Sequence, residues 1–359
     1  AYDYNTDTWE TLTGSGFDAS TGRAMAYIGS IPIPYSGPTW HVSTTGSDGT
    51  GDGSSSLPFA SIQAGINAAT NGDTVLVNAG TYTENINLNG KNITLIGNNR
   101  ETTIIDGDEA GRVLTINNVD TLTTIAGFTF TNGYTTSSGA GIYADNSTIN
   151  MTNCIISHNV NAGYAEGGGM YIKSSSFNIS NSIISNNSAY KFGGVCVYTQ
   201  ASLNANNVVF DSNTSSNNAS AIGTVSAGTV NLTNCTFVNN TGSDWWGRAV
   251  YAETAITIKN SISYNNDPGD FCGNNNTISV SYSLSQENYY VWGTSNQTSI
   301  TGNGNIFTAP QFEGEIRGDG TSLSTLLSQQ HMDEKSSSLR KYIILKILDN
   351  HFYFLVVHN

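Results

Sequence analysis

Asp244, Arg248, Asp267 and Asp270 lie near the C-terminal end of a repetitive stretch in this chain of 359 residues. In stacked coils, carboxylates one coil apart lie about 5 Å from each other. That spacing is close to the carboxyl separation with which retaining glycosidases cleave a glycosidic bond. These four residues are therefore the candidates for catalysis. The alternative is that the aspartates cap turns.

The repetitive stretch has an asparagine-rich bend and a glycine-rich bend in each repeat. Aromatic residues recur in the turns that lead from the first kind of bend to the second. They are Tyr134, Tyr164, Tyr190, Phe192, Trp245, Trp246 and Phe271. We predict that these rings share one edge of successive coils, although the turn "NTSSNNASA" has none. Such an edge could bind carbohydrate, because aromatic rings combine large apolar faces with a low entropy cost. The alternative is that the rings pack along the outside of the coil.

A repeat must position these residues. The pattern Asn-x-apolar-x-x-x-Asn begins at Asn153, Asn181, Asn207, Asn234 and Asn260, so that successive starts are 28, 26, 27 and 26 residues apart. Two further columns keep the same step: Ile149, Phe177, Leu203, Val230 and Ile256 form one, and Gly141, Gly169, Gly194, Ala221 and Ala249 form the other. Three columns in register indicate a structural repeat.

The repeat predicts an all-β fold, a right-handed parallel β-helix with three short strands in each coil of about 27 residues. Asparagine suits the bends because it tolerates the left-handed backbone conformation, and stacked amides can bond to one another as a ladder. Apolar residues at helical spacing predict a short amphipathic helix over residues 59–70, which would cap the N-terminal end of the β-helix.

Two stretches resemble known families. The segment "PFASIQAGINAATNGDTVLVNAGTYTENINLNGKNITLIGNN" (residues 58–99) resembles the opening of pectate-lyase-like right-handed β-helices. The GG-[IV]-Y and [IF]-x-x-N repeats are similar to those of polymorphic outer-membrane proteins and related surface β-helix proteins. The resemblance covers about residues 40–315 and implies the β-helix fold and an extracellular or cell-surface location. Enzymes with this fold commonly act on acidic polysaccharides.

Three regions follow from these patterns. Residues 1–38 are predicted to be a fragment of a preceding β module or a linker, residues 39–318 the β-helix, and residues 319–359 an atypical C-terminal tail or cap, because that tail is rich in Lys and Arg and poor in Gly.

Composition excludes several functions. A formal net charge of −14 argues against nucleic acid as a partner. No run of apolar residues is long enough to span a membrane, and the four cysteines lack metal-ligand spacing. No metal or cofactor is therefore expected, although a lyase would need Ca²⁺. Between Val113 and Asn266 the cations besides histidine are Lys173, Lys191, Arg248 and Lys259, and no cluster of acids surrounds them in the sequence.

The first functional hypothesis is a secreted or cell-surface scaffold, a non-catalytic adhesin or stalk that binds polysaccharide, a surface glycan or a neighbouring surface protein. The alternative is a polysaccharide lyase or glycoside hydrolase, although the residue motifs of pectin esterases and polygalacturonases are missing. Receptor binding in the manner of a phage tailspike is a third hypothesis and would need a trimer.

Overall fold

In the computed structural model, the described residues are 36–120, 123–242, 248–273, 278–281 and 283–285, with the backbone of several short strands outside these ranges. The chain divides into two compact units, Ala1–Ser36 and Gly37–Asn359. In the first unit, β1 (Tyr2–Asp3) pairs with β2 (Thr8–Trp9) in an antiparallel manner. The second unit contains a parallel β-helix.

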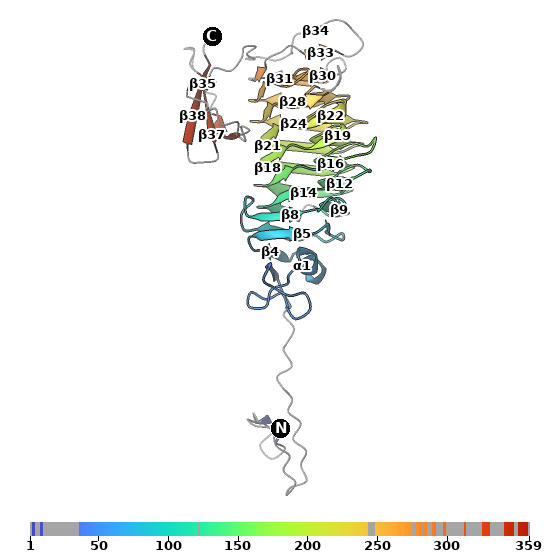
Figure 1. Ribbon diagram of the computed structural model, residues 1–359, viewed down its shortest axis with the longest axis vertical. Helices are drawn as coiled ribbons and strands as arrows, with labels where there is room; N and C mark the ends of the chain where they lie inside the picture. The colour runs from blue at the N-terminus through green and yellow to red at the C-terminus, as the bar shows by residue number, and fades with distance from the viewer. Residues whose placement is uncertain are drawn as a thin grey trace. The chain divides into compact units, whose positions relative to one another are not determined.

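One coil illustrates the path of the chain. It runs through β14 (Thr148–Thr152), β15 (Ile155–Ser157), β16 (Val160–Asn161) and β17 (Met170–Lys173). Each strand pairs in parallel with its counterpart one coil later, as Figure 1 shows in the stacked rows of arrows. The predicted parallel β-helix is therefore confirmed, and the short β16 adds a fourth segment to the three strands that the sequence indicated.

The strands form four rows. The first row is β3 (Thr39–Val42), β4 (Thr74–Val77), β7 (Thr94–Gly97), β10 (Thr123–Ala126), β14, β18 (Ser176–Ser185), β21 (Ser202–Asp211), β24 (Thr229–Thr233), β28 (Ile256–Lys259) and β31 (Ile278–Ser281). The second is β5 (Gly80–Thr83), β8 (Thr103–Asp106), β11 (Thr129–Thr131), β15, the ends of β18 and β21, β25 (Thr236–Val238), β29 (Ile262–Tyr264) and β32 (Leu284–Ser285).

The remaining two rows complete the coils. The third is β6 (Ile86–Asn87), β9 (Leu114–Asn117), β13 (Ile142–Asp145), β17, β20 (Val195–Tyr198), β23 (Ile222–Val225), β27 (Val250–Ala252), β30 (Phe271–Gly273) and β33 (Tyr289–Val291). The fourth is β12 (Tyr134–Thr135), β16, β19 (Ser188–Lys191), β22 (Thr214–Asn217) and β26 (Thr241–Gly242).

Outside these rows, β34 (Gln297–Thr298) pairs with β33, and β35 (Phe312–Glu313), β36 (Thr325–Gln330), β37 (Lys341–Ile347) and β38 (His351–Val357) pair with one another, all in an antiparallel manner. The last four strands fall mainly in the region that the sequence sets apart as a tail or cap.

The core is built from columns of inward-facing residues. Ile149, Phe177, Leu203, Val230 and Ile256 are paired in register and fully buried, as the sequence columns predicted. Neighbouring rings also stack, with the centroids of Phe210 and Phe237 4.8 Å apart. Since each buried side chain removes apolar surface from water, every added coil extends one continuous hydrophobic core.

The first asparagine of each repeat turns the chain. Asn153, Asn181, Asn207, Asn234 and Asn260 all have positive φ angles, between 50° and 57°. Asparagine adopts this left-handed conformation more readily than most residues. The expectation that these residues form bends is therefore confirmed.

The second asparagine of each repeat forms a buried ladder, here called the inner ladder: Asn159, Asn187, Asn213 and Asn240. Each Nδ2 donates to the Oδ1 of the next asparagine at 2.9–3.0 Å, the last of them to Asn266. Each Oδ1 also accepts a backbone N–H from the preceding coil, such as Gly133 N to Asn159 Oδ1 at 2.8 Å. These contacts satisfy amides that would otherwise be costly to bury.

The N-terminal helix α1 spans Ile62–Ala68, and Ser61 caps it. Glu84 accepts hydrogen bonds from the first helical N–H groups, of Ile62 and Gln63, and Lys91 Nζ donates to three carbonyl oxygens at the other end. The negative charge of Glu84 at the N-terminus of the helix and the positive charge of Lys91 at its C-terminus both interact favourably with the helix dipole. The helix begins later than predicted because Phe59 forms a parallel bridge with Val42 and stacks on Trp40.

Asn187→Ala should cost about 2–3 kcal/mol of unfolding free energy, because it leaves buried partners above and below without hydrogen bonds. Urea denaturation would measure the loss. The matched control is Asn178→Ala, which also breaks an asparagine row but at an exposed position, and it should cost about 1 kcal/mol or less. Equal losses in the two variants would show that burial of the inner ladder is not what makes it stabilising.

Candidate functional site

The predicted catalytic group does not form one accessible cluster. Asp244 lies outside the described residues, Asp267 is exposed, and Arg248 is buried. Asp270 is only 1% exposed, and its carboxylate accepts hydrogen bonds from Ser263, Asn266 and Ser285 at 2.7–2.9 Å. It therefore provides one acceptor for Asn266, the asparagine at the end of the inner ladder. The expectation that Asp270 could meet a substrate is wrong because this carboxylate is enclosed.

The predicted aromatic edge is only partly formed. Trp245 and Trp246 lie outside the described residues. Phe192 and Phe271 are fully buried, so the expectation that their rings could bind sugar is wrong. Phe192 has a φ of 58°, and its ring fills the space above Gly223, where an added Cβ would come within 2.2 Å of it.

Three of the predicted tyrosines do reach the surface. Tyr134 is 41% exposed and Tyr164 is 89% exposed, while Tyr190 is half-buried. Tyr134 pairs in register with the exposed Val160 on β16. The ring of Tyr164 meets the ring of Tyr190 edge to face, with centroids 5.1 Å apart. We call Tyr134, Val160, Tyr164 and Tyr190 the tyrosine surface.

An ionisable pair lies directly beside the tyrosine surface. Glu166 follows Tyr164 by two residues, and Lys191 follows Tyr190 directly. Glu166 and Lys191 form an isolated parallel bridge, and the Lys191 Nζ lies 4.0 Å from the Glu166 Oε1. The Cys196 Sγ donates to the Glu166 Oε2 at 3.6 Å. The structure thus brings together an acid and a base whose relation the sequence did not reveal.

The environment of Glu166 raises its pKa above the ordinary value of a glutamate. Its side chain is 19% exposed. Burial raises the pKa of Glu166, and the negative charge of Glu253 raises it further, while Lys191 and the Cys196 hydrogen bond lower it. Burial is the largest of these effects, so the pKa is raised overall. A carboxyl group with a raised pKa near exposed aromatic rings is a candidate general acid.

A second group of tyrosines, Tyr143, Tyr171 and Tyr198, stacks along the third row of strands. Consecutive centroids are 5.7 Å apart with interplanar angles of 9° and 30°, and the Arg112 guanidinium lies 4.7 Å above the Tyr143 ring. Their ring faces cover one another and are not open to a sugar. The stacking of these three rings therefore stabilises the fold. The tyrosine surface is the better candidate for binding a sugar.

Other types of site find little support in the described residues. No group of His, Cys, Asp or Glu in that part of the chain could hold a metal ion. Cys154, Cys196, Cys235 and Cys272 are free and buried. Lys173, which the sequence left without an acid, pairs with Asp145 at 2.9 Å. No helix in the described part is long and apolar enough to cross a membrane.

Glu166→Gln should gain stability relative to the native chain as the pH rises from 4 to 7. Because the folded pKa of Glu166 lies above the unfolded value near 4.5, its contribution to stability is fully present below that value and is lost as pH rises through the folded pKa. Thermal unfolding of both proteins across this range would measure the difference. Glu109→Gln, at an exposed turn, is the control. Melting curves of Glu166→Gln that track the native chain at every pH would contradict the raised pKa.

No family model and no curated protein matches this sequence. Among solved structures, the chain is similar to pectin methylesterase from carrot, with a TM-score of 0.44, 16% identity, and coverage of 76% of this chain and 89% of that one. The rice weevil pectin methyl esterase has a TM-score of 0.39 and 12% identity, and the match covers 73% of this chain and 88% of that one. The alginate lyase from Paenibacillus sp. str. FPU-7 has a TM-score of 0.27 and 12% identity, and the match covers 57% of this chain and 91% of that one. Similarity at these levels does not assign an activity.

Proposed function

We propose that this chain is a β-helix protein that recognises polysaccharide through its tyrosine surface. The observation that carries the proposal is the exposure of apolar side chains. Four large hydrophobic side chains are exposed among the described residues, and three of them, Tyr134, Val160 and Tyr164, belong to this surface. Exposed apolar side chains gathered in one place often mark a binding site.

Polysaccharide fits this surface better than a purely apolar partner does. A tyrosine ring offers an apolar face for the C–H groups of a sugar and a hydroxyl group for its oxygens. Asn217 Nδ2 already donates to the Tyr190 hydroxyl at 3.3 Å, which orients that ring. Polysaccharide recognition also agrees with the secreted or cell-surface location expected from the sequence, where a surface glycan or a neighbouring surface protein would be the partner.

A second candidate function is cleavage of the bound polysaccharide, as a lyase or a glycoside hydrolase. Glu166 favours this reading over a non-catalytic stalk, since a stalk has no need of a half-buried carboxyl group beside exposed tyrosines. In a hydrolase, Glu166, whose pKa is raised, would donate its proton to the leaving oxygen as the glycosidic bond breaks, a water molecule would bond to the anomeric carbon and release a proton to solvent, and Lys191 would pair with the resulting carboxylate. The enzymes similar in structure are described as acting on pectin and alginate, so both polymers belong in the first substrate panel.

Tyr164→Ala should weaken retention of the protein in gels that contain the bound polysaccharide, by about fivefold to tenfold, because it removes the most exposed ring. Tyr164→Phe should retain most of the binding. Leu57→Ala is the matched control, since Leu57 is 53% exposed in a different part of the chain. Affinity electrophoresis on pectin, alginate and neutral glucans would give the comparison. Equal effects of Tyr164→Ala and Leu57→Ala would count against the tyrosine surface.

Glu166→Gln should lower kcat by about 100-fold or more if the chain cleaves polysaccharide, because it removes the proposed general acid. Release of reducing ends and of unsaturated products would be followed with and without Ca²⁺. Asp267→Ala tests the exposed aspartate predicted from the sequence, and Glu109→Gln is the control. Turnover that survives Glu166→Gln but not Asp267→Ala would move the site to Asp267. A native chain that binds but does not cleave would leave the binding scaffold as the function.

A further inference from the structure

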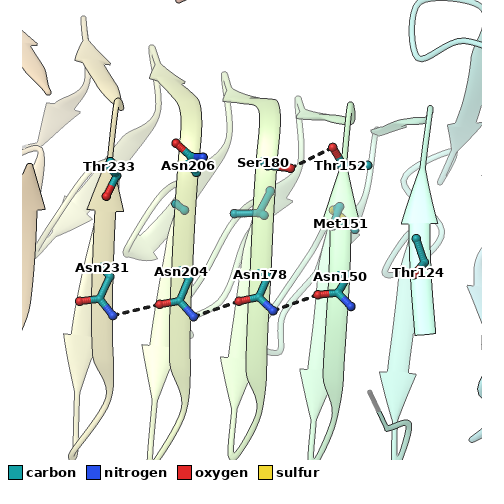
Figure 2. A pocket seen from close by; sticks show the side chains of 12 residues that line it. Thr124, Asn150, Met151, Thr152, Asn178, Ser180, Asn204, Asn206, Asn231 and Thr233 are labelled. Atoms are coloured by element: carbon teal, nitrogen blue, oxygen red, sulfur yellow. Dashed lines mark hydrogen bonds between the residues drawn. The ribbon is translucent and has the colours of Figure 1, made fainter. Parts of the chain in front are cut away.

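A groove lies on the outer side of the first row of strands, whereas Tyr134 and Val160 of the tyrosine surface lie on the fourth row. Its volume is about 460 Å³, and residues of β10, β14, β18, β21 and β24 line it (Figure 2). Outward-facing polar side chains form two rows along it. Between these rows the side chains of Met151, Ile179 and Ala205 are buried.

One row consists of Asn150, Asn178, Asn204 and Asn231, here called the outer asparagine row. The four residues are in register on successive strands and are exposed. The Nδ2 of Asn178, Asn204 and Asn231 each donates to the Oδ1 of the preceding asparagine at 2.9 Å, as the dashed lines in Figure 2 show. A primary amide has two N–H groups and an oxygen with two lone pairs. Within the row, Asn178 and Asn204 each use one N–H group and one lone pair, and the end residues use only one of the two. Each amide can therefore still offer a donor and an acceptor, about every 4.8 Å along the row.

The other row consists of Thr152, Ser180, Asn206 and Thr233. Ser180 Oγ donates to Thr152 Oγ1 at 2.9 Å, and Asn206 Oδ1 accepts from Asn234 Nδ2 at 3.1 Å. Hydroxyl and amide groups therefore face the groove from both sides. A ligand that runs across the strands would meet the same kinds of polar group at each step.

The charge of the groove selects the class of ligand. None of the twelve residues that line it is charged, and the chain has a net charge of −14. Beyond the groove, the row of side chains that contains Thr152, Ser180, Asn206 and Thr233 continues to Lys259, which is in register with Thr233 on the next strand, β28. A polyanion would find no cation in the groove to offset repulsion by the chain. Sugar hydroxyl groups, in contrast, match a surface of neutral donors and acceptors.

We propose that this groove binds an uncharged polysaccharide chain that lies across β14, β18, β21 and β24. The ligand runs along the axis of the coil, since the amide groups repeat in that direction. The site is on a different row of strands from the tyrosine surface, and the inference does not depend on the proposed function.

The test is calorimetric titration with neutral hexasaccharides of glucose, xylose and mannose, and with an oligogalacturonate of equal length. The double variant Asn178→Ala/Asn204→Ala removes two amides and should bind the neutral sugar about tenfold more weakly or worse. Ser180→Tyr places a ring in the groove without altering the outer row and should abolish binding. Thr257→Ala is the control, because Thr257 is exposed in register with Asn231 but outside the groove.

The expected result is binding of a neutral hexasaccharide that both groove variants impair and that Thr257→Ala leaves unchanged. Binding that survives Ser180→Tyr but is lost in Tyr164→Ala would overturn the groove and support the tyrosine surface. Oligogalacturonate bound as tightly as the neutral sugars, with the same dependence on Ser180, would overturn the charge argument. Failure of all three neutral sugars to bind would show that the outer row is a structural feature only. Unfolding curves of each variant would confirm that it is folded.

Discussion

The fold depends on the need of a buried amide for hydrogen bonds. In the inner ladder, Asn187 lies fully inside the coil and bonds to asparagines on both neighbouring coils and to the Ile156 carbonyl oxygen. A shift of one coil by a single residue would break these bonds and would also turn the inward-facing side chains outward. The ladder therefore fixes the register of the coils between Asn159 and Asn266, and the apolar columns supply most of the stabilisation within that register.

A fixed register leaves variation to the turns. The period of the repeat changes between 26 and 28 residues, yet the asparagines of the inner ladder stay paired. Tyr164, Glu166 and Lys191 belong to the turns that follow the ladder and to the strand ends beside them. A rigid coil that presents variable turns is a common arrangement of binding sites on repeat proteins. The outer asparagine row differs, because it lies on the regular strands and repeats with them.

Much of the fold could be predicted from the sequence because its signals are periodic. The column that contains Ile149 and Phe177 and the bends at Asn153 and Asn181 each recur once per coil. The site could not be predicted equally well, because side-chain direction in a turn depends on single backbone angles. Phe192 and Tyr190 are both aromatic, but the positive φ of Phe192 directs its ring onto the strand. The sequence contained one signal for this direction. Gly223 stands in register with Tyr143, Tyr171 and Cys196, and its missing side chain leaves a space that the ring of Phe192 can fill. Glu166 and Lys191 belong to turn regions of unequal length. Their pairing therefore does not follow the spacing of the repeat and could not be predicted from it.

The two rows of asparagine amides point in opposite directions along the axis. In the inner ladder each Nδ2 donates toward the following coil, as from Asn159 to Asn187. In the outer row each Nδ2 donates toward the preceding coil, as from Asn178 to Asn150. The outer row consequently has unlike ends, with amide N–H groups at Asn150 and a carbonyl oxygen at Asn231. A sugar polymer also has unlike ends, reducing and non-reducing, so its two orientations in the groove would be chemically distinct complexes of unequal energy.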